Sequence, residues 1–194
     1  MKAARIMLVD DTPTQSTILE QALLDQKLTV ACRVQSAQGL IKNVELHQPD
    51  IIIMVLASPD QDTLDNMAML NQHNPKPVIL FSGQSDSQII SQAVKAGASA
   101  YIVDGLNAHR IKPIMDAAIA RFNEFQTLRI ELQKTQSQLA DRKVIDQAKG
   151  LLMKTKSLNE EQAYHTMRKM AMDQSKPIAD IAKNILSVMS LLSS

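Results

Sequence analysis

Apolar runs alternate with segments of helical spacing over residues 1–105. In the helical segments apolar residues recur every three or four positions, as at Ile18, Leu19, Ala22 and Leu23. The apolar runs show no alternation with polar residues, so we expect them to be strands buried on both faces. The expected strands are Arg5–Asp10, Leu28–Val34, Asp50–Leu56, Pro77–Ser82 and Ala98–Val103, and the expected helices are 14–25, 37–47, 63–71 and 86–96. This order predicts an α/β doubly wound fold around a parallel five-stranded sheet.

The pattern changes at Asn107, after which turn-forming residues are nearly absent until about Lys154. Pro113 lies near the start of this stretch, where a first helical turn tolerates proline. Apolar residues recur every seven positions, with others between them, and form a heptad seam: Ile111, Ala118, Phe125, Leu132 and Leu139, then Ile114, Phe122 and Leu128. Such a repeat is typical of a coiled-coil helix, although Arg129, Thr135 and Gln136 fall at the intermediate places. Dimerisation through the seam is the favoured interpretation, and a helix packed on its own N-terminal domain is the alternative.

Two shorter helices are expected after Lys156. Asn159 is a candidate N-cap with Gln162 completing a capping box, and that helix is expected to end near Met172. Pro177 is expected to begin the last helix. Three short helices bury only a small core, so this part should lean on the long helix or on a partner. We therefore expect three parts, a domain of residues 1–106, a coiled-coil linker helix of residues 107–141 and a small three-helix domain of residues 142–194.

Charge is unevenly distributed along the chain, although the net charge is only +1. Residues 1–105 carry seven Lys and Arg against eleven Asp and Glu, a balance of −4, whereas residues 106–194 carry fourteen against nine, a balance of +5. The basic second half suggests a polyanion partner, with a solvated helix surface as the alternative. Only 3% of the residues are aromatic, which argues against a platform for many stacked single-stranded bases.

Several classes of site find no support in the sequence. No stretch reaches the ~18 apolar residues of a membrane helix, and the N-terminus lacks the apolar region of a signal peptide. We therefore expect a cytoplasmic protein without membrane contact. The single cysteine, Cys32, excludes an intramolecular disulfide and is expected to be a small buried hydrophobe. No phosphate-cradling, zinc-protease or nucleophile-elbow motif is present, and no cofactor is expected.

Sheets of this kind bind ligands at the carboxyl ends of their strands. The residues expected at these ends match those of a known family. They are Asp10 and Asp11, Val55 in the run PDIIIMVL, Ser82 in FSG, and Asp104 in YIVDG. In these segments residues 1–105 resemble a response-regulator receiver domain. The resemblance implies that Asp10 and Asp11 stand at the magnesium-binding positions and Ser82 at the switch position. Val55 stands where the family has its phosphoacceptor aspartate, and Asp104 where it has a lysine.

The departures from the family pattern argue against phosphorylation. Phosphoryl transfer to aspartate needs a carboxylate nucleophile, which Val55 lacks. It also needs cations that offset the phosphoryl charge, and Asp104 replaces a cation by an anion. We therefore expect a pseudo-receiver whose degenerate pocket does not accept phosphate in the usual way. Asp10 and Asp11 either hold a weak Mg²⁺ ion or are remnants on a solvated rim.

The C-terminal segment carries a second resemblance. Residues 142–153 read RKVIDQAKGLLM, and EEQAY at 160–164, MRKMAM at 167–172 and IADIA at 178–182 follow with ordered spacing. This segment resembles the ANTAR RNA-binding domain. Together with the degenerate receiver and the coiled coil, it makes the chain similar to antiterminators of the NasT and AmiR type. The resemblance implies binding to a leader RNA with paired hairpins, read-through of a terminator in nitrate or nitrite assimilation, and control by a separate ligand-sensing partner protein.

One face of the long helix gathers candidate contacts at steps of three and four, namely Arg142, Asp146, Lys149, Met153 and Lys156. Lys149 lies between Ala148 and Gly150, whose small size would let a phosphate or a loop base approach closely, with tight helix packing as the alternative. Tyr164 and Arg168 share a helix face, where a tyrosine stacks on an unpaired base and an arginine forks onto phosphate or guanine. A half-buried core residue is the alternative for Tyr164. The expected RNA-binding residues are Lys143, Ala148, Lys149, Gly150, Met153, Tyr164 and Arg168.

DNA binding, protein interaction alone and catalysis are the alternatives to RNA binding. A DNA-binding transcription factor would show a recognition helix rich in Arg, Asn or Gln, whereas the helix expected from Ile178 to Met189 offers only Lys183 and Asn184 of that kind. A pure protein-interaction module predicts no salt-dependent RNA binding. An enzyme is not expected, because Asp10 and the other strand ends lack a nucleophile with a neighbouring His or Lys.

Overall fold

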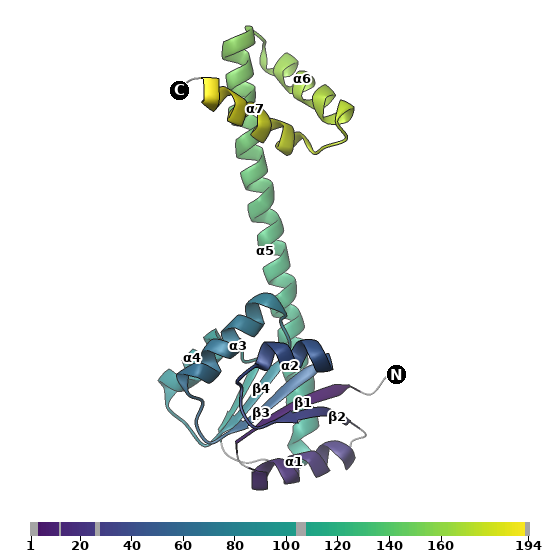
Figure 1. The fold of residues 1–194 in the computed structure, drawn as a ribbon, viewed down its shortest axis with the longest axis vertical. Coiled ribbons are helices and arrows are strands. Elements are labelled where there is room, and N and C mark those ends of the chain that lie inside the picture. The colour runs from purple at the N-terminus through teal and green to yellow at the C-terminus, as the bar shows by residue number, and fades with distance from the viewer. Residues whose placement is uncertain (1–3, 12, 26–27, 104–107, 193–194) are drawn as a thin grey trace. The chain divides into compact units, whose positions relative to one another are not determined.

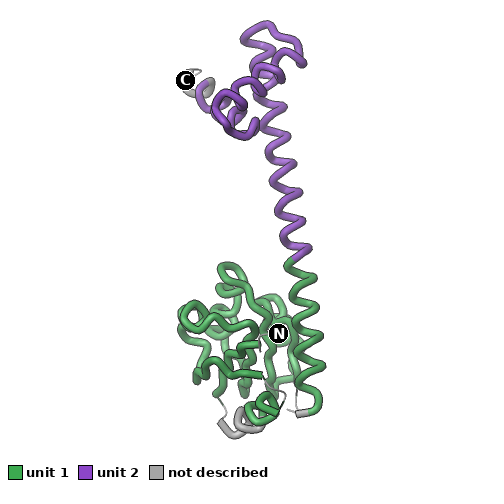
Figure 2. The backbone as a smooth tube through the Cα atoms, turned by 90° about the vertical axis from the view of Figure 1, so that its right-hand side faces the viewer, with its two compact units in different colours: residues 1–126 green, residues 127–194 purple. Residues whose placement is uncertain are grey.

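The computed structural model describes residues 4–11, 13–25, 28–103 and 108–192. The chain divides into two compact units, residues 1–126 and residues 127–194, which Figure 2 shows in different colours. Each unit is built around apolar clusters of its own. Asp104 lies outside the described residues, so its predicted place in the receiver pocket stays a prediction.

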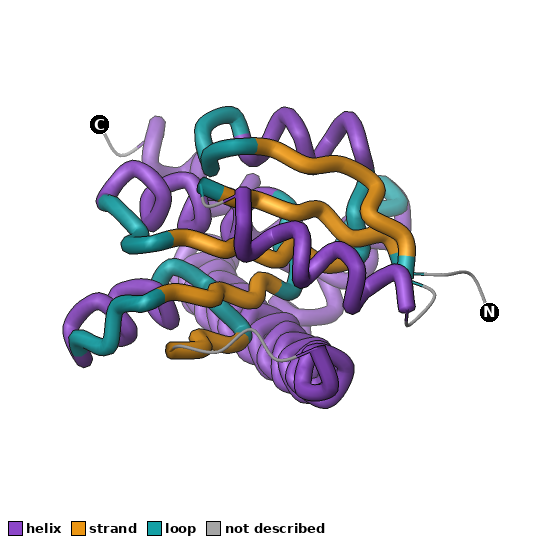
Figure 3. The backbone as a smooth tube through the Cα atoms, turned by 90° about the horizontal axis from the view of Figure 1, so that it is seen from below, coloured by secondary structure: helices purple, strands orange, loops and turns teal. Residues whose placement is uncertain are grey.

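Unit 1 contains a five-stranded parallel sheet with the strand order β2-β1-β3-β4-β5 (Figure 1). The strands are β1 (Arg5–Asp10), β2 (Thr29–Val34), β3 (Ile51–Leu56), β4 (Val78–Ser82) and β5 (Ala100–Val103). The helices between them are α1 (Pro13–Asp25), α2 (Leu40–His47), α3 (Gln61–His73) and α4 (Ser87–Lys95). Figure 3 shows helices on both sides of the strands. The predicted α/β doubly wound sheet is therefore confirmed.

Apolar side chains cover both faces of the sheet. Met7 and Val9 belong to a cluster that includes residues of α2 and α3, whereas Ile6 and Leu8 belong to a cluster that includes residues of α1. Successive side chains of a strand point to opposite faces. A strand with helices on both sides must therefore be apolar at every position, and β3 is buried at all six of its residues. This is the physical reason for the unbroken apolar runs in the sequence.

Two features of the helices differ from the prediction, beyond shifts of one or two residues at other helix ends. Helix α2 begins at Leu40 rather than at Ala37, because Gly39 takes a left-handed conformation with φ of 69° and the Leu40 N–H donates to the Ala37 carbonyl over 3.1 Å. Pro113 lies inside the long helix rather than in its first turn, because the helix already begins at Ala108. Proline has no N–H to donate, so the helix lacks one backbone hydrogen bond there.

Helix α5 runs from Ala108 to Lys156. Its first part packs on the sheet, since Ile111, Met115 and Ala118 are buried in one cluster with Ile6 and Leu8. The predicted seam is therefore wrong as a pairing surface at Ile111 and Ala118, where the alternative of a helix packed on its own domain holds. Four later seam residues are between 58% and 63% exposed, namely Phe125, Leu128, Leu132 and Leu139, whereas Phe122 is partly buried.

Unit 2 consists of the second part of α5 with α6 (Glu160–Asp173) and α7 (Ile178–Leu192). Its core collects apolar residues from the three helices, namely Ala148, Met167, Ala171, Ile181 and Ala182. The Asn159 side chain accepts the Gln162 N–H over 2.8 Å, and the Gln162 side chain accepts the Asn159 N–H over 3.0 Å. This confirms the predicted capping box at the start of α6.

Candidate nucleic-acid interface and degenerate receiver pocket

Asp10 ends β1 at the carboxyl edge of the sheet and is only 2% exposed. Arg33 on the neighbouring strand β2 donates to its carboxylate over 2.6 Å. Strand register explains the contact, because Arg33 pairs with Leu8 on β1. Arg33 was not among the predicted pocket residues. Its place near the end of the strand that adjoins β1 is the signal that could have identified it.

The other described pocket residues lie at the same edge of the sheet. Val55 pairs with Asp10 in register and is 1% exposed. The exposed Asp11 carboxylate accepts the Ala57 N–H, with both oxygens within 3.2 Å. Ser82 is buried and donates its hydroxyl to the Ala57 carbonyl over 3.1 Å. The fold thus brings the described residues of the predicted pocket together, and the side chains of Asp10, Asp11 and Ser82 each form a hydrogen bond within the protein.

The receiver resemblance implies a Mg²⁺ ion at this edge, but the residues present do not fit one. Magnesium needs oxygen ligands in near-octahedral geometry. The Asp10 carboxylate is held by Arg33, and Val55 offers no oxygen. Across residues 4–11, 13–25, 28–103 and 108–192, no three His, Cys, Asp or Glu side chains gather to hold a metal. Arg33 supplies the positive charge that a buried carboxylate requires.

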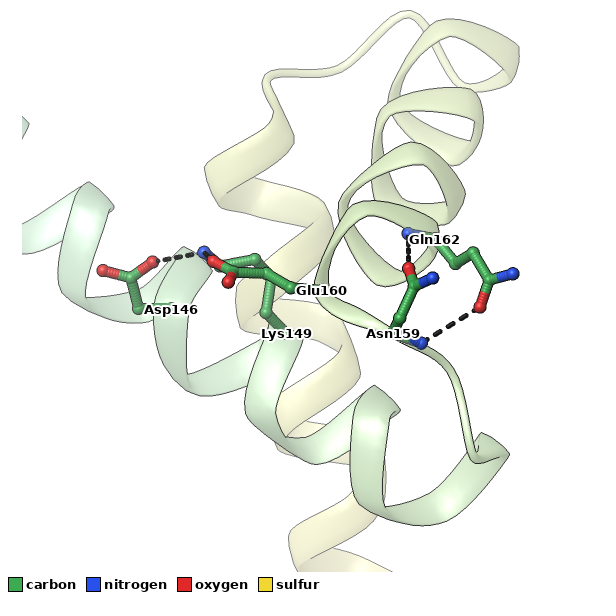
Figure 4. A network of polar contacts seen from close by, with 5 residues as sticks. All are labelled: Asp146, Lys149, Asn159, Glu160 and Gln162. Carbon is green, nitrogen blue, oxygen red and sulfur yellow. Dashed lines mark hydrogen bonds and ion pairs between the residues drawn. The ribbon is translucent and has the colours of Figure 1, made fainter.

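Lys149 lies in an ion-pair network at the surface of unit 2 (Figure 4). Its Nζ atom is 2.9 Å from the Asp146 carboxylate on α5 and 2.7 Å from the Glu160 carboxylate on α6. The hydrogen bond to Glu160, and then the one to Asp146, raises the pKa of Lys149. The hydrogen bond from Lys149 lowers the pKa of Asp146. The cation predicted to meet RNA is therefore paired within the protein, with 17% of its side chain exposed.

The small residues on either side of Lys149 have different surroundings. Ala148 is fully buried and packs in the core of unit 2, so the prediction that it contacts RNA is wrong and the alternative of helix packing holds there. Gly150 is only partly buried, and a Cβ atom added to it would meet no heavy atom within 4 Å. Internal packing therefore does not require glycine at position 150.

A hollow of about 520 Å³ on unit 2 brings three predicted contact residues together. Arg142, Lys149 and Tyr164 line it, and Tyr164 is 43% exposed. Two acids also line it: Asp146 pairs with Lys149, and Asp141 lies 3.5 Å from Lys183. Arg142 was predicted for this helix face but not for the RNA-binding set, and the structure places it in the lining with Lys149 and Tyr164.

The remaining predicted residues lie elsewhere on the unit. Lys143 is exposed and lines a second hollow beside Arg142. Arg168 is exposed, and it has no ion-pair partner in the parts of the chain that the structure describes. Met153 is 38% exposed. These three residues lie outside the lining of the hollow.

Two family models match the chain. The response regulator receiver domain matches residues 6–116, more than half of the protein, and the ANTAR domain matches residues 133–186. The chain belongs to the response-regulator receiver family and carries an ANTAR domain. Both matched domains belong to regulatory proteins.

Relatives support this assignment over nearly the whole chain. The transcriptional regulatory protein PdtaR of Mycobacterium tuberculosis is 25% identical over 95% of this chain and 90% of its own length. The aliphatic amidase regulator of Pseudomonas aeruginosa is 23% identical over 87% of this chain and 85% of its own length. The nitrate regulatory protein of Klebsiella oxytoca is 35% identical over 41% of this chain but only 20% of its own length.

Solved structures support the receiver fold. The signal receiver domain of the response regulator NarL from Mycobacterium tuberculosis has a TM-score of 0.53 at 20% identity, covering 61% of this chain and 98% of that domain. A LuxR-family response regulator from Aurantimonas sp. SI85-9A1 has a TM-score of 0.53 at 24% identity, and the match covers 61% of this chain and 86% of that chain. Within the described residues, no helix combines the length and apolar character that a membrane crossing requires.

Proposed function

We propose that this response regulator binds hairpin-containing leader RNA through its ANTAR domain and promotes transcription antitermination. The observation that carries the proposal is the hollow that gathers Arg142, Lys149 and Tyr164. Two cations and a half-exposed aromatic ring suit a phosphate backbone and an unpaired loop base. Lys143 on α5 and Arg168 on α6 would add further cations on the helices that form the hollow.

RNA phosphates would compete with carboxylates for Lys149. The lysine is held by Glu160 and Asp146, so binding would exchange protein ion pairs for phosphate contacts. Gly150 would let a phosphate or base approach the α5 backbone, because no side chain stands there and no protein atom fills the space. Met153 would offer apolar contact beside this approach.

Control would come from a ligand-sensing partner protein rather than from aspartyl phosphorylation. Val55 lacks the nucleophile, and Arg33 holds the Asp10 carboxylate that magnesium would need. The pseudo-receiver would then act as a fixed docking domain. The partner would dock on this domain. It would inhibit the protein by covering the RNA-binding hollow or the exposed seam, and its release would activate the protein.

The active form would be a homodimer joined by a coiled coil. We assign residues 1–106 to the pseudo-receiver, 107–141 to the linker helix and 142–194 to the ANTAR domain. The exposed apolar residues from Phe125 to Leu139 would form the pairing surface. Pairing would present two ANTAR domains to two hairpins, and avidity would raise affinity without new contacts.

The process served would be nitrate or nitrite assimilation in the cytoplasm. A nitrate regulatory protein is among the relatives, and the resemblance to antiterminators of the NasT type favours the same process. The aliphatic amidase regulator is also a relative. Growth on nitrate and on an aliphatic amide, each with and without the gene, distinguishes the two assignments.

The direct test is binding of the full chain to a two-hairpin leader RNA at two salt concentrations. We expect salt-dependent binding that Lys149→Ala and Arg168→Ala each weaken about tenfold. Lys134→Ala is the matched control, because Lys134 is exposed on α5 away from the hollow. Equal affinity of parent and variants, or equal affinity for duplex DNA, contradicts the proposal and favours the DNA-binding alternative or an interaction module.

A further inference from the structure

A separate hollow of about 300 Å³ lies in unit 1. Its walls come from the end of α3, the end of α4, the residues before β5 and the first part of α5, including Lys95, Ser99, Arg121 and Phe122. Ser99 directly precedes β5, so the hollow opens at the amino ends of the strands. The degenerate pocket of Asp10 and Ser82 lies at the carboxyl ends, at the opposite edge of the sheet.

The side chains of this hollow leave a hydrogen-bond donor without an acceptor. Gln126 lines it, and its Nε2 atom is buried without a hydrogen-bond partner among the described residues. A buried donor without a partner is costly, which makes such atoms rare in folded proteins. Because this atom is buried, an acceptor oxygen in the hollow would reach it only after the Gln126 side chain turns.

The charges around the hollow have one sign. Lys95 and Arg121 line it, and no Asp or Glu does. Neither cation has an ion-pair partner in the parts of the chain that the structure describes. Phe122 and Phe125 add aromatic walls. Ligand pockets combine mostly apolar walls with a few convergent polar groups, and this volume lies at the small end of their usual range.

We propose that this hollow binds a small organic carboxylate with an aromatic or similarly flat apolar body. The carboxylate pairs with Lys95 and Arg121 and accepts from the Gln126 amide once that side chain turns, and the apolar body packs against Phe122 and Phe125. Inorganic phosphate would leave the aromatic walls without contact, and a neutral aromatic would leave the cations unpaired. The proposal goes beyond RNA binding and does not rest on it, because every residue involved belongs to unit 1. Phe125 also belongs to the seam proposed for pairing, so a dimer that buries Phe125 would exclude this ligand.

The position of Gln126 gives such binding a route to regulation. Gln126 and Arg121 lie on α5, the helix that continues to Lys156 and supplies Ala148 to the core of the ANTAR unit. A ligand that satisfies Gln126 stabilises α5 against the receiver sheet. The receiver unit would then sense a metabolite directly, in addition to any signal that a partner protein brings.

Ligand-observed NMR on the full-length protein tests the proposal with benzoate as the probe, and with benzamide and acetate as comparisons. We expect benzoate to bind with a Kd of about 1 mM or tighter, and the other two at least about tenfold more weakly. Arg121→Gln should weaken benzoate binding about tenfold. Arg110→Gln is the matched control, because Arg110 is exposed on the same helix but does not line the hollow.

Three results would overturn the proposal. The first is no benzoate binding at about 10 mM, a concentration that would occupy most sites of the expected affinity. The second is equal binding of benzoate and benzamide, or unchanged benzoate binding in Arg121→Gln. The third is benzoate binding that disappears as light scattering shows dimer forming, which means that a second copy covers the hollow. Gln126→Leu adds a check where circular dichroism shows that it folds, since loss of the amide donor should also weaken benzoate binding.

Discussion

The Nζ atom of Lys149 lies 2.7 Å from the Glu160 carboxylate, so a cation on α5 is paired with an acid at the start of α6. Glu160 is also in the first turn of α6, where a negative charge suits the helix dipole. An RNA phosphate at Lys149 must compete with this carboxylate.

Glu160→Gln should therefore strengthen RNA binding. The substitution removes one of the two negative charges that hold Lys149, and we expect an affinity gain of about two- to fivefold at low salt. Glu161→Gln is the matched control, because Glu161 is an exposed acid in the same helical turn. Filter binding or fluorescence anisotropy on the same leader RNA measures the effect. Weaker binding by Glu160→Gln than by Glu161→Gln would mean that Glu160 orients Lys149 for RNA rather than competing with RNA.

The pKa shifts of Asp146 and Lys149 set the pH range in which the RNA affinities of these variants should be compared. The lowered pKa of Asp146 means that its contribution to stability is present above its unfolded pKa and is lost as the pH falls through the folded value. The raised pKa of Lys149 means that its contribution is present below its unfolded pKa and is lost as the pH rises through the folded value. Both ion pairs persist at neutral pH, which is where the affinities should be compared.

Gly150→Ala should separate stability from RNA binding. A Cβ atom at this position meets no heavy atom within 4 Å, so alanine should fit and stabilise α5 by about 0.5–1 kcal/mol. RNA binding should weaken, because the added methyl group would occupy the space through which a phosphate or base approaches the α5 backbone. Ala140→Gly at an exposed position of α5 is the reciprocal control, with lower stability and unchanged RNA binding. Thermal unfolding and RNA titration give the two values, and a Gly150→Ala protein that binds RNA as well as the parent excludes close approach at this residue.

The capping box of α6 should contribute measurably to the stability of unit 2. Asn159→Ala removes the side chain that accepts the Gln162 N–H, and we expect a loss of about 1 kcal/mol in the free energy of unfolding. Asn159→Ser retains an N-capping oxygen and should recover most of this loss. Denaturant titration followed by circular dichroism measures it. If both variants unfold like the parent, the capping box contributes nothing to stability.

Dimerisation should depend on the exposed half of the heptad seam. Leu132→Asp and Leu139→Asp place a charge in the proposed apolar interface, and each should shift the protein towards monomer. Gln133→Asp adds the same charge at an exposed polar position beside the seam. Sedimentation velocity at several concentrations compares the three variants. A parent that stays monomeric at the highest concentration would reject the coiled-coil dimer of the free protein.

The receiver pocket should be inert to small phosphodonors. With Arg33 on Asp10 and no carboxylate at Val55, we expect intact-mass spectrometry to show no phosphorylation after incubation with acetyl phosphate and Mg²⁺. Val55→Asp alone should stay unphosphorylated as well, because Arg33 still holds Asp10. A phosphorylated Val55→Asp protein would show that the lost nucleophile was the only defect of the pocket.

Local patterns explain how much of this molecule could be predicted from the sequence. Unbroken apolar runs such as Ile51–Leu56 fit strands buried on both faces, and the order of strands and helices predicted the sheet class. The Asn159 capping box was equally predictable, because both of its hydrogen bonds join residues three apart in the chain. In each case the deciding interactions are short-range or depend on a simple period.

The tertiary structure decided which partner each predicted residue meets. Ala148 and Gly150 differ by two positions, yet one is buried in a core of three helices and the other lies beside open space. The heptad repeat continues from Ile111 to Leu139, but its first part covers the sheet because the sheet offers an apolar face there. The contact of Arg33 with Asp10 joins separate elements, as does that of Lys149 with Glu160. The composition of a segment determines whether it forms a helix or a strand, but a long-range contact depends on where the folded chain places its second residue.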